Sequence, residues 1–146
     1  MSHSVAHWFL TDDRQQPRKW RIPTGVSIAA GGYRRFDELD FGSAFRLSSL
    51  GEQVYCFAAD SEGTLTGYSH GFSFGAAATG VSFGRHLIST GAEHFVAQRR
   101  ATIGAANDGP RVGPLVISEL RYHPPEGAME YLEIVKHRRE RDHPLR

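Results

Sequence analysis

The chain of 146 residues lacks the features that mark several classes of protein. It has one cysteine, so no disulfide can form within it, and a disulfide scaffold is excluded. No apolar run approaches the roughly 18 residues of a membrane span, and the first residues lack the basic and apolar regions of a signal peptide. The formal net charge is only +1, from 17 basic and 16 acidic residues, which argues against strong general attraction to nucleic acid.

The sequence is rich instead in turn formers and short apolar runs. Its 16 glycines, together with Pro, Asp and Ser clusters, separate short alternating segments, a pattern typical of an all-β sandwich or barrel. No ten-residue window has the apolar spacing of a helix, so no helix is predicted. Strands are expected at 8–10, 19–22, 26–28, 33–36, 45–47, 53–57, 64–70, 94–96, 115–120 and 130–135. The segment from Phe72 to Phe83 alternates aromatic with small residues, which suits a strand or a loop with close backbone approach.

Short motifs occur in a fixed order along residues 8–107, and two more follow after a break. The first set is Trp8-Phe9-Leu10-Thr11-Asp12-Asp13, Trp20-Arg21-Ile22-Pro23, Ile28-Ala29-Ala30-Gly31-Gly32-Tyr33, Phe45-Arg46-Leu47-Ser48 with Gly51-Glu52-Gln53-Val54-Tyr55, Ser82-Phe83-Gly84-Arg85, and Ile103-Gly104-Ala105-Ala106-Asn107. The second set is LVISELRYHPP from Leu115 and EYLEI from Glu130. Together they resemble the lamin tail domain, an immunoglobulin-like β-sandwich. Ala30 departs from that pattern, which has proline there, and Val135 and Lys136 stand where the family has asparagine.

The resemblance implies a permuted organisation. Residues 1–107 resemble the C-terminal portion of a lamin-tail-like sandwich, 108–114 a linker, and 115–135 the opening strands of a second copy. Residues 136–146 are predicted to be a disordered tail, whose abrupt start suggests a frameshift, a truncated frame or an arbitrary boundary in a tandem array. Residues 115–135 can complete the first sandwich within the chain or in a neighbour. A linker of about ten residues from Ala105 to Pro114 favours completion within the chain.

Residues suited to catalysis are few, and each has a simpler structural interpretation. Cys56 lies inside the strongest predicted strand, where a buried and inert thiol is the usual case. No Gly-x-Ser-x-Gly nucleophile motif occurs, and the turn around Gly84 and Arg85 is more simply a strand edge than a phosphate site. Glu119 and Glu133 form a conceivable acid–base pair, but they match family positions that we interpret as structural. The sequence therefore predicts no enzyme.

Metal-ligating residues are scattered rather than clustered. His3 and His7 have the spacing of a helical pair but lie in a terminal segment, and His70 and His86 could meet only across strands. Five carboxylates offer oxygen ligands but lack the spacing of a calcium loop, namely Asp12, Asp13, Asp37, Glu38 and Asp40. Satisfied or solvated side chains are the favoured interpretation, so no metal and no cofactor is predicted.

Arginine doublets offer one candidate interaction surface. The pairs Arg34–Arg35 and Arg99–Arg100 lie near aromatic residues in the sequence, as nucleic-acid surfaces do, and a third basic doublet stands at 138–139. The near-zero net charge favours a solvated rim over a strong nucleic-acid site.

The resemblance implies a non-catalytic structural or binding module of a larger, bacterial surface or secreted, repeat protein. Its expected partner is a protein or a cell-surface component, and the chain is expected as a monomer or a strand-swapped dimer. The alternatives are an accessory module that binds nucleic acid, or a fragment of a multidomain hydrolase whose catalytic domain lies outside this chain.

Overall fold

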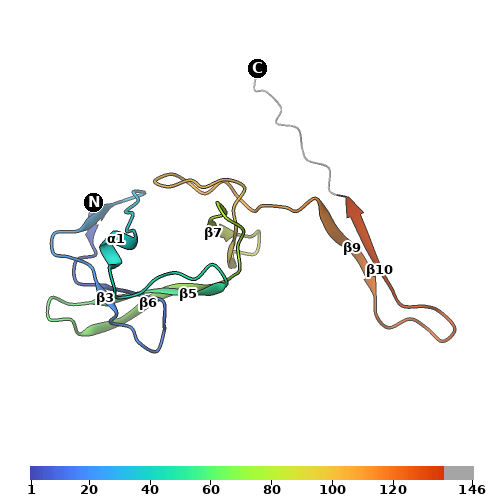
Figure 1. Ribbon diagram of the computed structural model, residues 1–146, viewed down its shortest axis with the longest axis horizontal. Helices are drawn as coiled ribbons and strands as arrows, with labels where there is room; N and C mark the ends of the chain where they lie inside the picture. Colours follow the sequence, from blue (N-terminus) through green and yellow to red (C-terminus); the bar gives the residue numbers. More distant parts are fainter. Residues whose placement is uncertain (137–146) are drawn as a thin grey trace, which may run out of the picture. The chain divides into compact units, whose positions relative to one another are not determined.

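The computed structural model describes residues 1–136 and divides the chain into two units, residues 1–110 and a second unit that begins at Arg111 (Figure 1). Within this range both units are built from antiparallel strands, and the helical content is one turn. The predicted all-β class is therefore confirmed. The predicted tail, apart from Lys136, lies outside the described residues. No helix in the described range is long and apolar enough to cross a membrane.

Unit 1 contains one four-stranded sheet and two smaller ones. The four-stranded sheet has the order β3-β2-β5-β6, while β1 pairs with β4 and β7 pairs with β8. The strands span Ser2–Ser4 (β1), Phe9–Thr11 (β2), Trp20–Arg21 (β3), Ser27–Ala29 (β4), Gly51–Ala59 (β5), Leu65–Gly75 (β6), Phe83–Leu87 (β7) and Glu93–Ala97 (β8).

The long hairpin of β5 and β6 sets the register of the main sheet. Its turn forms because the Asp60 carboxylate accepts the N–H groups of Glu62 and Thr64, both at 2.9 Å, and Gly63 takes a φ of +88°. The resulting ladder places Tyr55 opposite Gly71. A Cβ atom on Gly71 would lie 2.2 Å from the Tyr55 ring, so only glycine fits there.

Aromatic side chains form a second layer over two parts of one face of this sheet. The register places Trp20 and Phe72 on the same face, on the two edge strands β3 and β6. The Trp20 ring meets Phe36 and Phe41, at centroid distances of 5.2 and 5.4 Å, and Phe72 stacks on Phe95 of β8 at 4.5 Å. Figure 1 shows the helix and β7 on the same side of β5 and β6. These two clusters cover parts of one face of the sheet, because a sheet with one apolar face must bury that face against another layer.

The segment between β4 and β5 differs from its prediction. The strands expected at 33–36 and 45–47 are absent, and the helical turn α1 (Glu38–Phe41) lies between them. The turn forms because Asp37 accepts the N–H of Leu39 while the Asp40 carboxylate accepts the N–H of Asp37, a capping box. Of the aromatic residues that suggested strands, Phe36 packs on Trp20 of the sheet, Phe45 stacks on Phe41, and Tyr33 is exposed.

The side chain of Gln98 is only 3% exposed, and it joins three backbone segments of unit 1 by hydrogen bonds. Its amide nitrogen donates to the carbonyl oxygens of Gly84 and Val96, both at 3.2 Å, and its amide oxygen accepts the N–H of Gly109 at 3.0 Å. Pro110 also bridges to Gln98 in an antiparallel arrangement. Residues 108–110 of the predicted linker are therefore bound to unit 1, and the link to the next strand shortens to residues 111–114.

The described part of unit 2 is a single hairpin. Strands β9 (Leu115–Arg121) and β10 (Tyr131–Lys136) pair in antiparallel fashion. Their connection contains Pro124 and Pro125, and it turns where the N–H of Ala128 donates to the Pro125 carbonyl at 3.0 Å. Both strands lie where alternation in the sequence predicts them.

Replacing Gly71 with alanine tests the close approach of β5 and β6. Gly71→Ala is expected to lower the free energy of unfolding by about 1–3 kcal/mol, because the new methyl group must displace the Tyr55 ring or the Val54 carbonyl. Urea unfolding followed by circular dichroism measures the change. Gly75→Ala in the same strand is the matched control, since its Cβ would meet nothing within 4 Å. Equal effects of the two substitutions would contradict this packing.

Candidate functional site

Arg34 and Arg35 have partners within unit 1. The Arg34 guanidinium lies 5.7 Å from the centre of the Phe36 ring, and the Arg35 Nη2 atom lies 3.2 Å from a carboxylate oxygen of Asp37. Both contacts belong to the loop that leads into α1. These contacts hold the Arg34 and Arg35 side chains along this loop and do not bring them together with Arg99 and Arg100.

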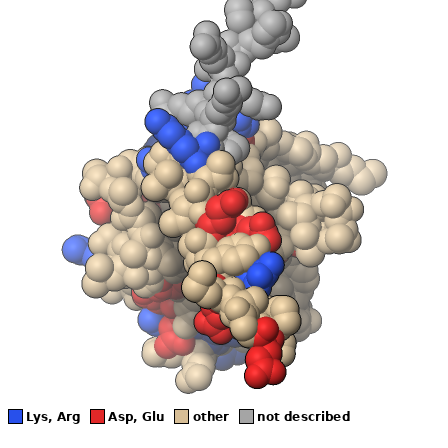
Figure 2. All heavy atoms as spheres, turned by 90° about the vertical axis from the view of Figure 1, so that its right-hand side faces the viewer, with Lys and Arg blue, Asp and Glu red and all other residues tan. Residues whose placement is uncertain are grey.

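Arg99 and Arg100 converge on a different loop. Arg99 donates to the backbone carbonyl of Asp108, at 2.9 and 2.5 Å, and Arg100 donates to the Asp108 carboxylate at 3.0 Å. The bond from Arg100 holds the pKa of Asp108 below its usual value. Figure 2 shows basic and acidic side chains scattered among uncharged residues on the face drawn. The third doublet, residues 138–139, lies outside the described residues.

The residues considered as metal ligands are dispersed. Within residues 1–136 no group of three or more His, Cys, Asp or Glu side chains is placed to hold a metal ion. The His70 Nε2 atom lies 3.3 Å from Glu93 rather than beside His86, and His86 pairs across β7 and β8 with His94. Residues 37–40 are used in the cap and first turn of α1.

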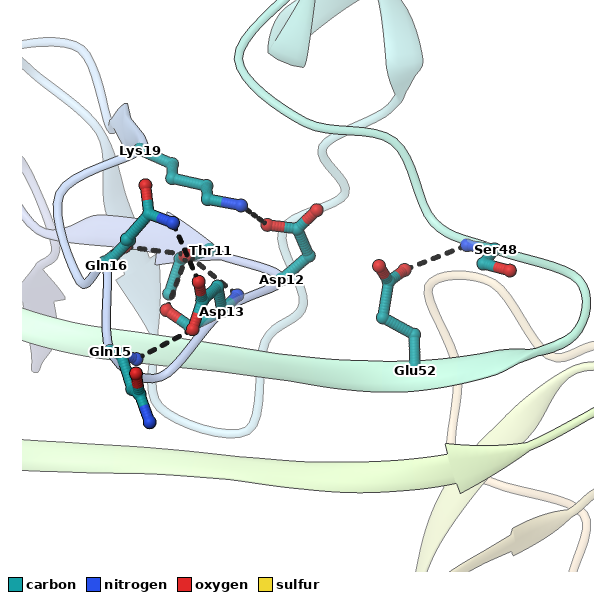
Figure 3. Close-up of polar contacts among 8 residues, drawn as sticks. All are labelled: Thr11, Asp12, Asp13, Gln15, Gln16, Lys19, Ser48 and Glu52. Atoms are coloured by element: carbon teal, nitrogen blue, oxygen red, sulfur yellow. Dashed lines mark hydrogen bonds and ion pairs between the residues drawn. The ribbon is translucent and has the colours of Figure 1, made fainter.

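A polar hollow in unit 1 holds the remaining carboxylates of interest (Figure 3). Asp12 accepts a bond from Lys19 Nζ at 2.5 Å, and Asp13 accepts the N–H of Gln15 at 2.8 Å. The bond to Asp12 raises the pKa of Lys19, and the Gln15 N–H lowers the pKa of Asp13. The fully buried Thr11 hydroxyl accepts the N–H of Asp13 at 3.0 Å. These groups stabilise one another's charged forms and fix the loop after β2.

Cys56 lies in the central strand β5 and is partly buried. Burial raises the pKa of its thiol from 9.0 to about 11. A thiol with this pKa is protonated at neutral pH, whereas a nucleophilic cysteine needs the thiolate.

A bulge in β9 separates polar from apolar side chains in unit 2. Glu133 pairs with Glu119 and the next residue, Ile134, pairs with Ile117, so Ser118 is an extra residue without a partner on β10. In an unbroken strand, alternation would place Glu119 on the face of Ile117. The bulge moves Glu119 to the opposite face, which the sequence alone could not assign.

On the polar face of the hairpin, two hydroxyl groups donate hydrogen bonds to the two glutamates. The Tyr131 hydroxyl donates to Glu119, and the Ser118 hydroxyl donates to Glu133. The Arg121 guanidinium lies 5.0 Å from the Tyr131 ring centre, and the bond to Glu119 raises the pKa of Tyr131. The two glutamates considered as an acid–base pair thus lie opposite each other, but each holds a neighbouring hydroxyl group.

The other face of the hairpin is aliphatic and open to solvent. Five aliphatic side chains share this face with Lys136, which pairs with Leu115 at one end. Each of the five is more than half exposed: Leu115 (61%), Ile117 (65%), Leu120 (58%), Leu132 (52%) and Ile134 (58%). A two-stranded hairpin is at best marginally stable in water without an apolar contact. Within residues 111–136 no element covers this face. The register, and not the alternation of the sequence alone, shows which residues this face contains.

Unit 1 carries an apolar groove where β5 begins and β6 ends. It has a volume of ≈ 270 Å³, and its described lining contains aliphatic, aromatic, glycine and hydroxyl-bearing residues from Leu47–Ser49 and from Phe74–Phe83. The N–H of Ala77 donates to the Ser49 carbonyl at 3.2 Å, which joins the two loops. Leu47 in the wall is 52% exposed. The run of small residues between Phe74 and Phe83 was the sequence signal for this close approach.

Comparison with known proteins yields no relative. No protein-family model, no curated protein and no solved structure matches the chain. The resemblance to the lamin tail domain therefore stays a prediction carried by the motifs.

The reactivity of Cys56 tests its burial in β5. In the folded protein at pH 8, alkylation by iodoacetamide is expected to be about 100-fold slower than in the unfolded chain, because the raised pKa reduces the thiolate fraction. Thiolate forms as the pH rises, so the rate should increase about tenfold per pH unit until pH 11 is approached. Mass spectrometry of timed samples measures the rate. A plateau already at pH 8 would contradict this environment.

Proposed function

We propose that this chain is a non-catalytic β-sheet module that binds another polypeptide through the apolar face of β9–β10. The five exposed leucine and isoleucine side chains on that face carry the proposal. By the motif resemblance, the module belongs to a larger bacterial surface or secreted protein with repeated domains.

The physical basis of the proposal is the imbalance between the two faces of the hairpin. On the polar face the two hydroxyl groups donate to the two glutamates, and the Arg121 guanidinium lies over the Tyr131 ring. Full burial of a leucine or isoleucine side chain contributes about 1.5–3 kcal/mol, so covering the exposed parts of five contributes about 4–8 kcal/mol. A partner that supplies this cover stabilises both itself and the hairpin.

The rival functions have less support. For catalysis, the candidate thiol of Cys56 has a raised pKa, and the candidate glutamates accept hydrogen bonds from neighbouring hydroxyl groups. For nucleic-acid binding, the candidate arginines within residues 1–136 contact two separate loops, through Phe36 and Asp37 on one and Asp108 on the other. Salt-dependent retention on DNA that is lost on substitution of Arg34 and Arg35 would favour this rival over the proposal.

A dye that binds apolar surface tests whether the face is available. Ile134→Ser should reduce the fluorescence of anilinonaphthalene sulfonate on the full chain, because it replaces an exposed aliphatic side chain of this face with a small polar one. The measurement is a dye titration at the lowest protein concentration that fluorescence permits, so that self-association does not hide the face.

Val135→Ser is the matched control for this titration. Val135 is the next residue of β10, is 46% exposed and lies on the opposite face beside Glu133. It should leave dye binding close to that of the unsubstituted chain. Equal dye binding by all three proteins would overturn the proposed function.

A further inference from the structure

Two histidines lie directly opposite each other on the small sheet of β7 and β8. The register pairs His86 with His94, one step along the ladder from the pair of Leu87 and Glu93. We propose that the two imidazoles chelate one divalent transition-metal ion of the Zn²⁺, Ni²⁺ or Cu²⁺ type. This inference goes beyond the proposed function and does not depend on it.

The pair lies at the centre of its sheet, and the sheet is anchored on β6. It is the third of five cross-strand pairs, so the backbone on both sides of each histidine belongs to the ladder. Phe95 of β8 stacks on Phe72 at 4.5 Å, and a carboxylate oxygen of Glu93 lies 3.3 Å from the Nε2 atom of His70. The backbone of both strands is therefore in place before an ion binds, which lowers the entropic cost of binding.

The two imidazoles share the face of this sheet that points away from β6. Because side chains alternate along a strand, Phe95 and Glu93 point toward β6, and His94 points the other way, beside His86. His94 is exposed and His86 is partly exposed. Both rings can therefore change rotamer, and an ion and its remaining water ligands can reach them from solvent.

Directly opposed side chains have a separation that suits a chelate. The Cβ atoms of such a pair lie about 4.5–5.5 Å apart. Imidazole nitrogens bind Zn²⁺ at about 2.0–2.1 Å, so two nitrogens on one tetrahedral ion lie about 3.4 Å apart. Rotation about the two side-chain torsions of each ring spans this difference. Imidazole suits Zn²⁺, Ni²⁺ and Cu²⁺, whereas Mg²⁺ and Ca²⁺ prefer oxygen ligands.

The charges of β7 and β8 do not oppose a cation at this pair. Within the two strands, no Lys, Arg, Asp or Glu shares the face of the histidines, because Arg85 lies on the opposite face and donates to Glu93 at 2.6 Å. The neighbouring position on the histidine face is Gly84, and a Cβ there would lie 2.8 Å from the Gln98 amide and 2.9 Å from that of Asn107. Uncharged amides therefore border the pair on this side.

A Zn²⁺ titration followed by NMR of the histidine side chains tests the site in the full chain near neutral pH. The ring signals of His86 and His94 should move together, at the same Zn²⁺ concentration. His86→Gln and His94→Gln should each weaken this binding more than about tenfold, because the second bond of a chelate forms within one molecule. His123→Gln removes an exposed histidine of unit 2 and is the matched control, which should leave binding unchanged.

Each other outcome overturns the chelate. A His94 signal that responds equally well in the His86→Gln variant would show that each ring binds metal separately. Shifts confined to other histidines, or equal weakening by His123→Gln, would place the ion elsewhere. The titration of the unsubstituted chain tests the site without relying on the folding of any variant, since His86 and His94 signals that stay fixed up to about millimolar Zn²⁺ would exclude it.

Discussion

A β-sheet with one apolar face needs a second layer to cover it, and this constraint governs both units of the chain. In unit 1 the cover comes from aromatic side chains borne on loops and on a small neighbouring sheet, with Trp20 held against Phe36 and Phe41, and Phe72 stacked on Phe95. In unit 2 the described residues form only one layer, so five aliphatic side chains face solvent. The same requirement is met in one unit and left open in the other, and the proposed binding role follows from that difference.

The bulge at Ser118 keeps the carboxylate of Glu119 off the open aliphatic face. Without the extra residue, β9 would carry Glu119 among the aliphatic side chains, and burial of the face would leave a carboxylate without solvent. With the extra residue, Glu119 and Glu133 both lie on the polar face, where Tyr131 and Ser118 donate to them. A single irregularity of pairing therefore gathers five aliphatic side chains on one face and both glutamates on the other.

The sequence predicted the long elements better than the short ones. Strands β5, β9 and β10 follow from alternation and from β-branched and aromatic residues, and the turn at Asp60 follows from its side chain. The strands predicted at 33–36 and 45–47 were wrong: Phe36 packs on Trp20 of the sheet and Phe45 stacks on Phe41, and neither segment pairs in a sheet. The turn α1 is too short for any apolar period and depends on the reciprocal bonds of Asp37 and Asp40. The groove joins loops about 30 residues apart, and the faces of the hairpin depend on its register, so neither could be derived from local pattern.

The central claim is that the apolar face of β9–β10 is open and available to a partner. Amide hydrogen exchange of residues 115–121 and 131–136 in dilute protein tests it most directly, because a lone hairpin opens freely whereas a covered one does not. The claim predicts that these amides exchange rapidly while the amides of β5 and β6 stay protected. Hairpin amides as strongly protected as those of β5 and β6 would contradict the claim.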